Sequence, residues 1–204
     1  MSDDRLAQQI AFLIEADKLK NIIRRTPLMD SSRRENSAEH SWHLVVAAMV
    51  LYEYSADEVD LLRVLEMLAV HDLVEIDAGD TFAYDVQDLV TKAERELAAA
   101  DRVFALLPPD QASRLRLLWE EFEAHATPDA RFANAMDRLQ PLLQNACAQG
   151  GSWRDHDVDR EQVLSRMAPI QSAAPAAWPL VLKIVDDFCA SGLLRAAPTS
   201  QPST

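Results

Sequence analysis

The stretch AVHDLVEIDAGD, residues 69–80, places a histidine and several carboxylates at the end of a long apolar run. On a helix, Leu68, His71, Asp72 and Glu75 fall at positions i, i+3, i+4 and i+7, which share one face. That face would otherwise be entirely core, and burying polar groups there is costly unless they are paired or bind a cation. The stretch therefore predicts a polar site inside the fold, with the rest of the chain arranged around it.

Composition favours a single all-α domain, a helical bundle. The chain has 204 residues, of which 49% are hydrophobic and only 4 are glycine. Alanine and leucine are frequent and β-branched runs are few, which favours helices over a sheet. This length suffices for one well-buried domain and does not require two. We expect the domain over residues 1–195 and a disordered, polar, proline-containing tail over residues 196–204.

The charge of the chain limits its partners. A net charge of −13 argues against nucleic acid, because no overall basic field is present to displace counterions from a phosphate backbone. No apolar run approaches the ~18 residues of a membrane span, and the N-terminal residues lack the features of a secretory signal. We therefore expect a soluble, cytoplasmic protein. Residues 17–34 carry six basic residues against two acidic ones, which would either attract an anionic substrate or form a solvated basic face.

Periodicity and capping signals predict helices along most of the chain. Asn36 and Glu39 have the spacing of a capping box, and Thr127 followed by Pro128 is a strong helix start. Pro27 ends the first helix, so residues 26–32 should form a loop. The predicted helices span about residues 5–23, 36 or 37 through 51, 58–77, 89–107, 113–125, 128 through 143, from 160 onward, and 179–193.

Three of these helices carry residues with metal-ligand chemistry. His40, His71, Asp72 and Asp137 match the donor set of one hard or borderline divalent cation. Pro141 gives no N–H to the carbonyl of residue 137, so a kink there would aim Asp137 inward. The residues alone leave an alternative open, in which the histidine is a satisfied core residue and the aspartates are caps or ion-pair members. His43 lies on the same helix face as His40. It is either a core histidine or a residue that supports a second metal ion.

The order and spacing of three separated motifs carry a resemblance to a known family. SAEHSWH surrounds His40, AVHDLVEIDAGD contains the His71-Asp72 pair, and AMDRLQP contains Asp137. Together they resemble the HD superfamily of metal-dependent phosphohydrolases, and within it the small single-domain branch that includes bacterial 5′-deoxynucleotidases. The similarity covers roughly residues 13–141.

The resemblance implies functional roles for further residues. It makes His40, His71, Asp72 and Asp137 the ligands of one divalent metal ion, which would be Mn, Co, Zn, Fe or Mg. It also implies that Glu75 acts on the attacking water and that Asp80 contributes to catalysis or binds the sugar hydroxyl. The resemblance assigns a contact with substrate phosphate to Arg25. Guanidinium chemistry makes Arg33 and Arg34 further candidates for that contact, independently of the resemblance. The family often forms homodimers, so a homodimer is expected here.

One position departs from the pattern of the characterised deoxynucleotidases. Thr26 stands where those enzymes have a tryptophan that helps select deoxyribose, which puts selectivity for deoxynucleotides in doubt. We expect a phosphohydrolase that releases phosphate from nucleoside 5′-monophosphates. The alternatives are hydrolysis of another nucleotide or small phosphate ester, and a non-catalytic module that binds metal and nucleotide. Phe82 and Tyr84 are candidates for lining a nucleoside pocket, and Trp42 and Trp119 are expected in the core.

Overall fold

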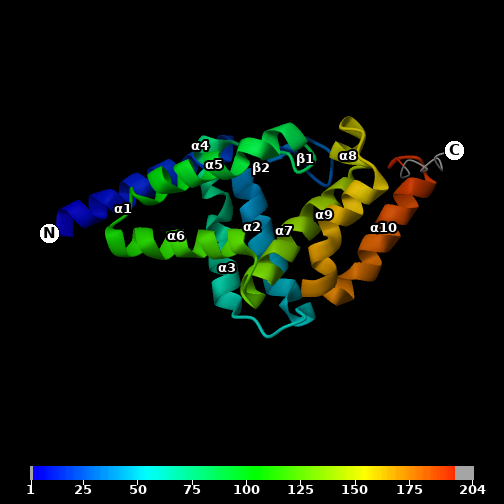
Figure 1. Cartoon of the computed structure of the whole chain (residues 1–204). Coiled ribbons are helices and arrows are strands. Elements are labelled where there is room, and N and C mark those ends of the chain that lie inside the picture. The colour runs from blue at the N-terminus through cyan, green and yellow to red at the C-terminus, as the bar shows by residue number, and fades with distance from the viewer. Residues whose placement is uncertain (1, 196–204) are drawn as a thin grey trace.

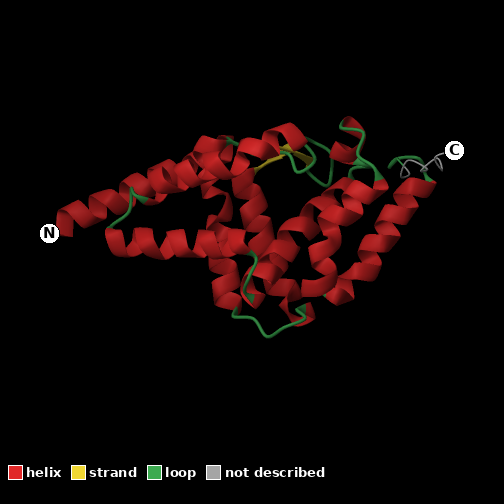
Figure 2. Ribbon diagram, viewed as in Figure 1, coloured by secondary structure: helices red, strands yellow, loops and turns green. Residues whose placement is uncertain are grey.

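Helices make up most of the structure, a computed structural model that describes residues 2–195 without the side chains of residues 2, 3, 86, 87 and 89 (Figure 2). The predicted tail over residues 196–204 lies outside the described residues. The helices are α1 (Ser2–Ala16), α2 (Ser37–Leu51), α3 (Leu61–Val70), α4 (Glu75–Ala78), α5 (Val86–Phe104), α6 (Pro109–Ala124), α7 (Pro128–Cys147), α8 (Gly151–Asp155), α9 (Arg160–Ala173) and α10 (Trp178–Ala190). Short 3₁₀ turns are η1 (Asp17–Asn21), η2 (Tyr52–Tyr54), η3 (His71–Val74) and η4 (Pro175–Ala177). The prediction of an all-α fold is confirmed.

The helices pack around α7, which runs through the middle of the molecule (Figure 1). α7 contacts α2 and α3 on one side and α9 on the other. Fully buried side chains such as Leu44, Leu68, Phe132 and Ile170 form the core between these helices. α1, α5 and α6 extend away from this centre as an elongated arm. The predicted site therefore lies where the central helices meet. Within residues 2–195 the structure contains no helix long and apolar enough to cross a membrane.

A small antiparallel sheet frames the loop predicted over residues 26–32. Residues 28–32 form that loop as predicted, whereas Thr26 and Pro27 belong to a strand. β1 (Ile23–Pro27) pairs with β2 (Arg34–Asn36), with Ile23 opposite Asn36 and Pro27 opposite Arg34. The register shifts between the two pairs. The sequence did not predict these strands because they are very short and mostly polar, so they show no alternating apolar pattern. The hairpin lies against the start of α2 and against α7 and α8.

The helix predicted over residues 58–77 is broken in the middle. α3 begins after the N-cap Asp60 and ends at Val70, and the chain then tightens into η3 before α4. Gly79 ends α4 with φ of 76°, as expected for a residue that tolerates positive φ. The first predicted helix is also divided, because α1 ends at Ala16 and η1 follows. The break at η3 carries His71 and Asp72 of the predicted site.

The start of α7 follows the prediction, with the Thr127 side chain accepting a hydrogen bond from the N–H of Ala130 and proline at the first position. The helix continues through Pro141 to Cys147. α8 was not predicted and forms where we expected a polar connection. Trp119 is buried as expected, but the expectation for Trp42 is wrong, because this indole is 66% exposed on α2.

Candidate metal centre and active site

His40 lies in the first turns of α2, whose start is fixed by the predicted capping box. The side chain is fully buried, and its Nδ1 lies 3.1 Å from Oε1 of Gln140. Nε2 of Gln140 donates to Oε1 of Glu35 at 2.8 Å, which turns the amide oxygen toward His40. Nδ1 of His40 is therefore the donor, and Nε2 faces Oδ1 of Asp137 at 3.0 Å. Metal-binding histidines usually have their second nitrogen held in this way.

His71 and Asp72 begin η3 at the end of α3. Nδ1 of His71 donates to the carbonyl oxygen of Leu68 at 2.9 Å, so Nε2 carries the lone pair. Among the described residues this buried Nε2 has no hydrogen-bond partner, although it lies 3.0 Å from Oδ1 of Asp72 and 3.9 Å from Oδ1 of Asp137. A buried lone pair facing carboxylate oxygens is unfavourable unless a proton or a metal ion lies between them.

The spacing of the four predicted ligands fits one cation. Candidate ligand atoms of His40, His71 and Asp72 all lie within 4.8 Å of one another. Oδ1 of Asp137 adds a fourth, 3.0 Å from Nε2 of His40 and 3.9 Å from Nε2 of His71. Two bonds of ~2.1 Å to one metal ion separate their ligand atoms by roughly 3–4 Å. The structure therefore brings all four residues together, and their donor set suits a divalent cation.

The charges around the cluster also favour a cation at this position. Burial and Arg24 disfavour the charged form of His40, but Asp137, Glu35 and Asp72 outweigh them and raise the pKa of His40 to about 9. Burial also opposes ionisation of Asp137, yet the hydrogen bond with His40 and the nearby cations hold the pKa of Asp137 well below its ordinary value. A proton on His40 thus occupies the place of a metal ion, which would displace it on binding.

Arg24 of β1 holds the carboxylates around this cluster. Its Nη1 donates to Oδ2 of Asp72 at 2.9 Å and lies 3.5 Å from Oδ1 of Asp80 and 3.8 Å from Oε1 of Glu75. Its Nε faces Oε2 of Glu35 at 3.9 Å. The resemblance assigns a substrate contact to Arg25, whereas the sequence presents Arg24 only as one of the six basic residues over residues 17–34. On a strand, neighbouring side chains point to opposite faces, and Arg24 is the one that faces the carboxylates.

Glu75 and Asp80 lie beside the candidate metal ligands, as the HDxxE and GD motifs predicted. Oε2 of Glu75 accepts a 2.5 Å hydrogen bond from Oγ of Ser37, and its side chain is buried. Burial raises the pKa of Glu75 well above its ordinary value, and the Asp72 carboxylate adds to this effect. Burial also raises the pKa of Asp80, although Arg24 opposes the shift. Both carboxyl groups are thus disposed to hold a proton, as an acid–base group must.

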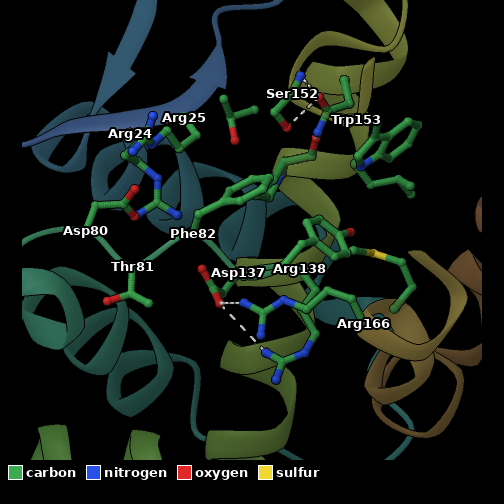
Figure 3. Close-up of a pocket in the computed structure, with 17 residues that line it drawn as sticks. Arg24, Arg25, Asp80, Thr81, Phe82, Asp137, Arg138, Ser152, Trp153 and Arg166 are labelled. Carbon is green, nitrogen blue, oxygen red and sulfur yellow. Dashed lines mark hydrogen bonds and ion pairs between the residues drawn. The ribbon is translucent and has the colours of Figure 1, made fainter. Parts of the chain in front are cut away.

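The cavity beside the cluster has two lobes that share the side chains of Arg24, Asp80 and Asp137. Figure 3 shows the first of these lobes. One lobe extends toward Thr26 and Trp153, and the other toward residues of the arm. The side chains that line the second lobe include Lys92, Glu96, Glu123 and His125. Residues 80–84 line the first lobe, which places Phe82 in its wall. The centre of the Phe82 ring lies 5.3 Å from that of Tyr84 and 4.3 Å from that of His156.

The three arginines predicted to bind phosphate are not brought together. Arg25 is exposed and lines the cavity next to Thr26. Arg33 instead forms an ion pair with Glu39, 2.6 Å long, and neither it nor Arg34 is among the residues that line the two lobes. His43, a candidate for supporting a second metal, contacts the amide of Gln140 at 3.2 Å. It lies behind the cluster and adds no ligand atom to it.

Sequence reasoning missed several residues that shape the site. Gln140 and Glu35 support His40, and Arg24 contacts the carboxylates. Gln140 stands in the AMDRLQP motif, whereas Glu35 and Arg24 stand in no pattern with a recognisable spacing. Arg138 and Arg166 also lie at the cavity, each 3.7 Å from Oδ2 of Asp137. Burial and the neighbouring Arg166 lower the pKa of Arg138 to about 10. Only the neighbouring position of Arg138 in the AMDRLQP motif could have indicated a role.

Fold and site together define an α-helical domain with one set of two histidines and two aspartates arranged as a candidate metal centre. The family model described as HD domain matches residues 16–178, and the chain belongs to this family. The resemblance drawn from the three motifs is thereby confirmed.

Individual relatives agree with this assignment. A crystal structure of a predicted metal-dependent phosphohydrolase from Magnetospirillum magnetotacticum MS-1 is 50% identical, with a TM-score of 0.88 over 96% of this chain and 100% of that one. The human 5′-deoxynucleotidase HDDC2 is 31% identical over 112 residues, which are 55% of this chain and 53% of the relative. The chain thus spans about half the length of this curated relative. A conserved hypothetical protein from Pyrococcus furiosus shares the fold. It is 20% identical, with a TM-score of 0.62 over 89% of this chain and 99% of that one.

Proposed function

We propose that this chain is a metal-dependent phosphohydrolase that releases phosphate from nucleoside 5′-monophosphates, with one divalent cation held by His40, His71, Asp72 and Asp137. The convergence of these four side chains beside two further carboxylates carries the proposal. Similarity to a predicted metal-dependent phosphohydrolase and to proteins named 5′-deoxynucleotidase supports it. The donor set suits Mn, Co, Zn, Fe or Mg to different degrees.

A divalent cation supplies two things at such a site, a lower pKa for water and polarisation of a phosphoryl oxygen. The chain's own residues supply the proton transfers. Glu75, held by Ser37, accepts a proton from the attacking water, because its raised pKa makes it a better base than an ordinary carboxylate. Asp80, which lines the cavity, donates a proton to the leaving 5′ oxygen or binds the sugar hydroxyl. Arg24 keeps both carboxylates next to the cluster.

The sugar preference depends on Thr26. This residue is buried in the wall of the cavity lobe that also contains Trp153. Threonine is smaller than the tryptophan of the characterised deoxynucleotidases, so the wall leaves more room beside the sugar. We therefore propose that ribonucleotides and deoxynucleotides are both accepted.

The exposed surface of α2 supports the homodimer that the resemblance implies. Trp42, Met49 and Val50 are more than half exposed, at 66%, 54% and 63%. A group of large apolar side chains on one exposed helix is typical of a protein interface. We propose that two copies of the chain pair through α2, in the cytoplasm and without nucleic acid as a partner. Trp42→Glu should then convert a dimer to a monomer in light scattering.

The proposed function is tested by phosphate release from a panel of nucleoside mono-, di- and triphosphates. Metal-stripped protein receives Mn²⁺, Co²⁺, Zn²⁺ or Mg²⁺ in turn. Release should occur only with metal, should favour monophosphates, and should be abolished in His71→Ala. His125→Ala is the matched control, since this histidine lines the outer part of the cavity and is not among the ligands. Absence of release from every nucleotide with every metal would refute the proposal.

A further inference from the structure

Two arginines from different helices meet at the outer oxygen of one candidate metal ligand. Nη1 of Arg138, on α7, and Nη2 of Arg166, on α9, each lie 3.7 Å from Oδ2 of Asp137 (Figure 3). The other oxygen of the same carboxylate, Oδ1, faces Nε2 of His40 at 3.0 Å. Both arginine distances exceed the length of a direct hydrogen bond. The carboxylate therefore attracts the two guanidinium groups and leaves most of their donors available.

Arg138 is held rigidly while part of its guanidinium remains unsatisfied. Its side chain is 9% exposed, and its Nη1 donates to the backbone oxygen and to Oδ1 of Asn134 at 3.3 and 3.1 Å. Its buried Nε has no hydrogen-bond partner among the described residues. An arginine offers five hydrogen-bond donors in a fixed plane. A buried donor that lacks an acceptor costs free energy. A ligand in the cavity with several acceptor oxygens could instead accept from the Nη groups of this guanidinium, whose side chain lines the cavity.

The charge of the site requires cations other than Arg24. Five carboxylates surround the cluster, namely Glu35, Asp72, Glu75, Asp80 and Asp137. One divalent cation and Arg24 supply three positive charges, which only balance Glu35, Asp72 and Asp137 even when Glu75 and Asp80 hold protons. Arg24 is engaged with four of these carboxylates, at 2.9 to 3.9 Å. A phosphoryl dianion would therefore meet no excess positive charge at the cluster itself, and Arg138 and Arg166 supply two further positive charges beside it.

The position of the pair also suits a substrate. Both arginines line the two lobes of the cavity and an open groove outside it. That groove is bounded by Tyr84, Ser165 and Pro169 among others. An anion between the arginines would lie next to the candidate metal ligands, and its organic substituent could extend along the groove.

We propose that Arg138 and Arg166 form the subsite that binds the phosphoryl group of a dianionic phosphomonoester. This inference rests on the proposed function and deepens it. It moves phosphate recognition from the β1–β2 hairpin, where Arg25 was expected to provide it, to the α7–α9 side of the cavity. It also predicts discrimination against phosphodiesters, which carry one negative charge and have fewer oxygens free for two guanidinium groups.

Calorimetry of inorganic phosphate binding to the Mn²⁺-loaded full chain tests the subsite without requiring turnover. Arg166→Gln is the main variant because this side chain is 37% exposed and its loss should not impair folding. Arg160→Gln is a matched control on the same helix, also 37% exposed and paired with Asp186. We expect Arg166→Gln to weaken phosphate binding by about tenfold or more, Arg166→Lys to restore part of it, and Arg160→Gln to leave it unchanged.

Mn²⁺ affinity, measured by electron paramagnetic resonance, separates this role from support of Asp137. Binding of Mn²⁺ should be nearly unchanged in Arg166→Gln. Unaltered phosphate affinity, or an equal loss of Mn²⁺ and phosphate affinity, would overturn the subsite, as would failure of the wild type to bind phosphate. If the wild type binds phosphate as expected yet hydrolyses no nucleotide, the proposed function fails while the subsite stands. If nucleotides are hydrolysed, Arg166→Gln should raise KM more than it lowers kcat.

Discussion

Replacement of Arg24 by methionine should destabilise the metal-free protein far more than the metal-loaded protein. Nη1 of Arg24 lies 2.9 Å from Asp72, and the two side chains are only 13% and 11% exposed. The pair therefore belongs to the buried class, in which removal of one partner costs about 3–5 kcal/mol. An exposed pair would contribute only about 0–1 kcal/mol. Three more carboxylates within 3.9 Å of Arg24 lose the same cation.

Urea denaturation with EDTA, and again with saturating Mn²⁺, measures this difference. In EDTA we expect the free energy of unfolding to fall by about 3–5 kcal/mol. Mn²⁺ should restore much of the loss, because a divalent cation neutralises the same carboxylates. Arg33→Met is the control, since Arg33 pairs with Glu39 at the surface and is 53% exposed, so its loss should cost less than about 1 kcal/mol. A loss from Arg24→Met that is equally small with and without metal would refute this reasoning.

The metal-free variant should also show a specific pH dependence. The folded protein raises the pKa of Glu75 above its ordinary value of 4.5, mainly through burial. Between those two pKa values the folded state binds more protons than the unfolded chain, so stability falls as pH rises. Loss of Arg24 removes a group that opposes this shift. The destabilisation should therefore be smaller in mildly acidic buffer than in mildly alkaline buffer.

Further variants test the support of the cluster, the proposed base and the backbone beside the cavity. Gln140→Leu should lower Mn²⁺ affinity by about 10–100-fold, because it removes the group that holds a ligand histidine, whereas Gln144→Leu, also buried in α7, should leave the affinity unchanged. Glu75→Gln should abolish turnover and keep Mn²⁺ binding, and an active variant would show that this carboxyl group is not the base. Gly151→Ala should lower the thermal unfolding temperature more than Gly192→Ala, because an added Cβ would lie 2.6 Å from a neighbouring oxygen at the first position and meets nothing within 4 Å at the second.

Much of the site could be predicted because its residues stand in compact motifs. His71, Asp72, Glu75 and Asp80 lie within ten consecutive residues, where helical spacing alone places the first three on one face. The capping box likewise fixed where the helix carrying His40 begins. Local signals such as these are independent of the rest of the fold.

The cationic side of the site could not be predicted in the same way. The sequence offers Arg24 and Arg25 as neighbours, and only the formation and register of a short polar strand decide which one faces the carboxylates. Arg166 reaches Asp137 because α9 packs on α7, and no periodicity within either helix specifies that contact. Long-range packing therefore determines which arginine side chains reach the site. The local sequence pattern determines where the carboxylate side chains lie.

The candidate ligands also have a consequence for synthesis of the chain. They come from α2, from η3 at the end of α3, and from α7, so residues 40, 71, 72 and 137 appear on the ribosome in that order. A nascent chain that has not yet exposed α7 can bring together at most the two histidines and Asp72. It lacks the fourth ligand and the helix that supports His40 through Gln140. The complete set of candidate ligands therefore exists only after the central helix has emerged, and an early cation would meet only an incompletely supported set.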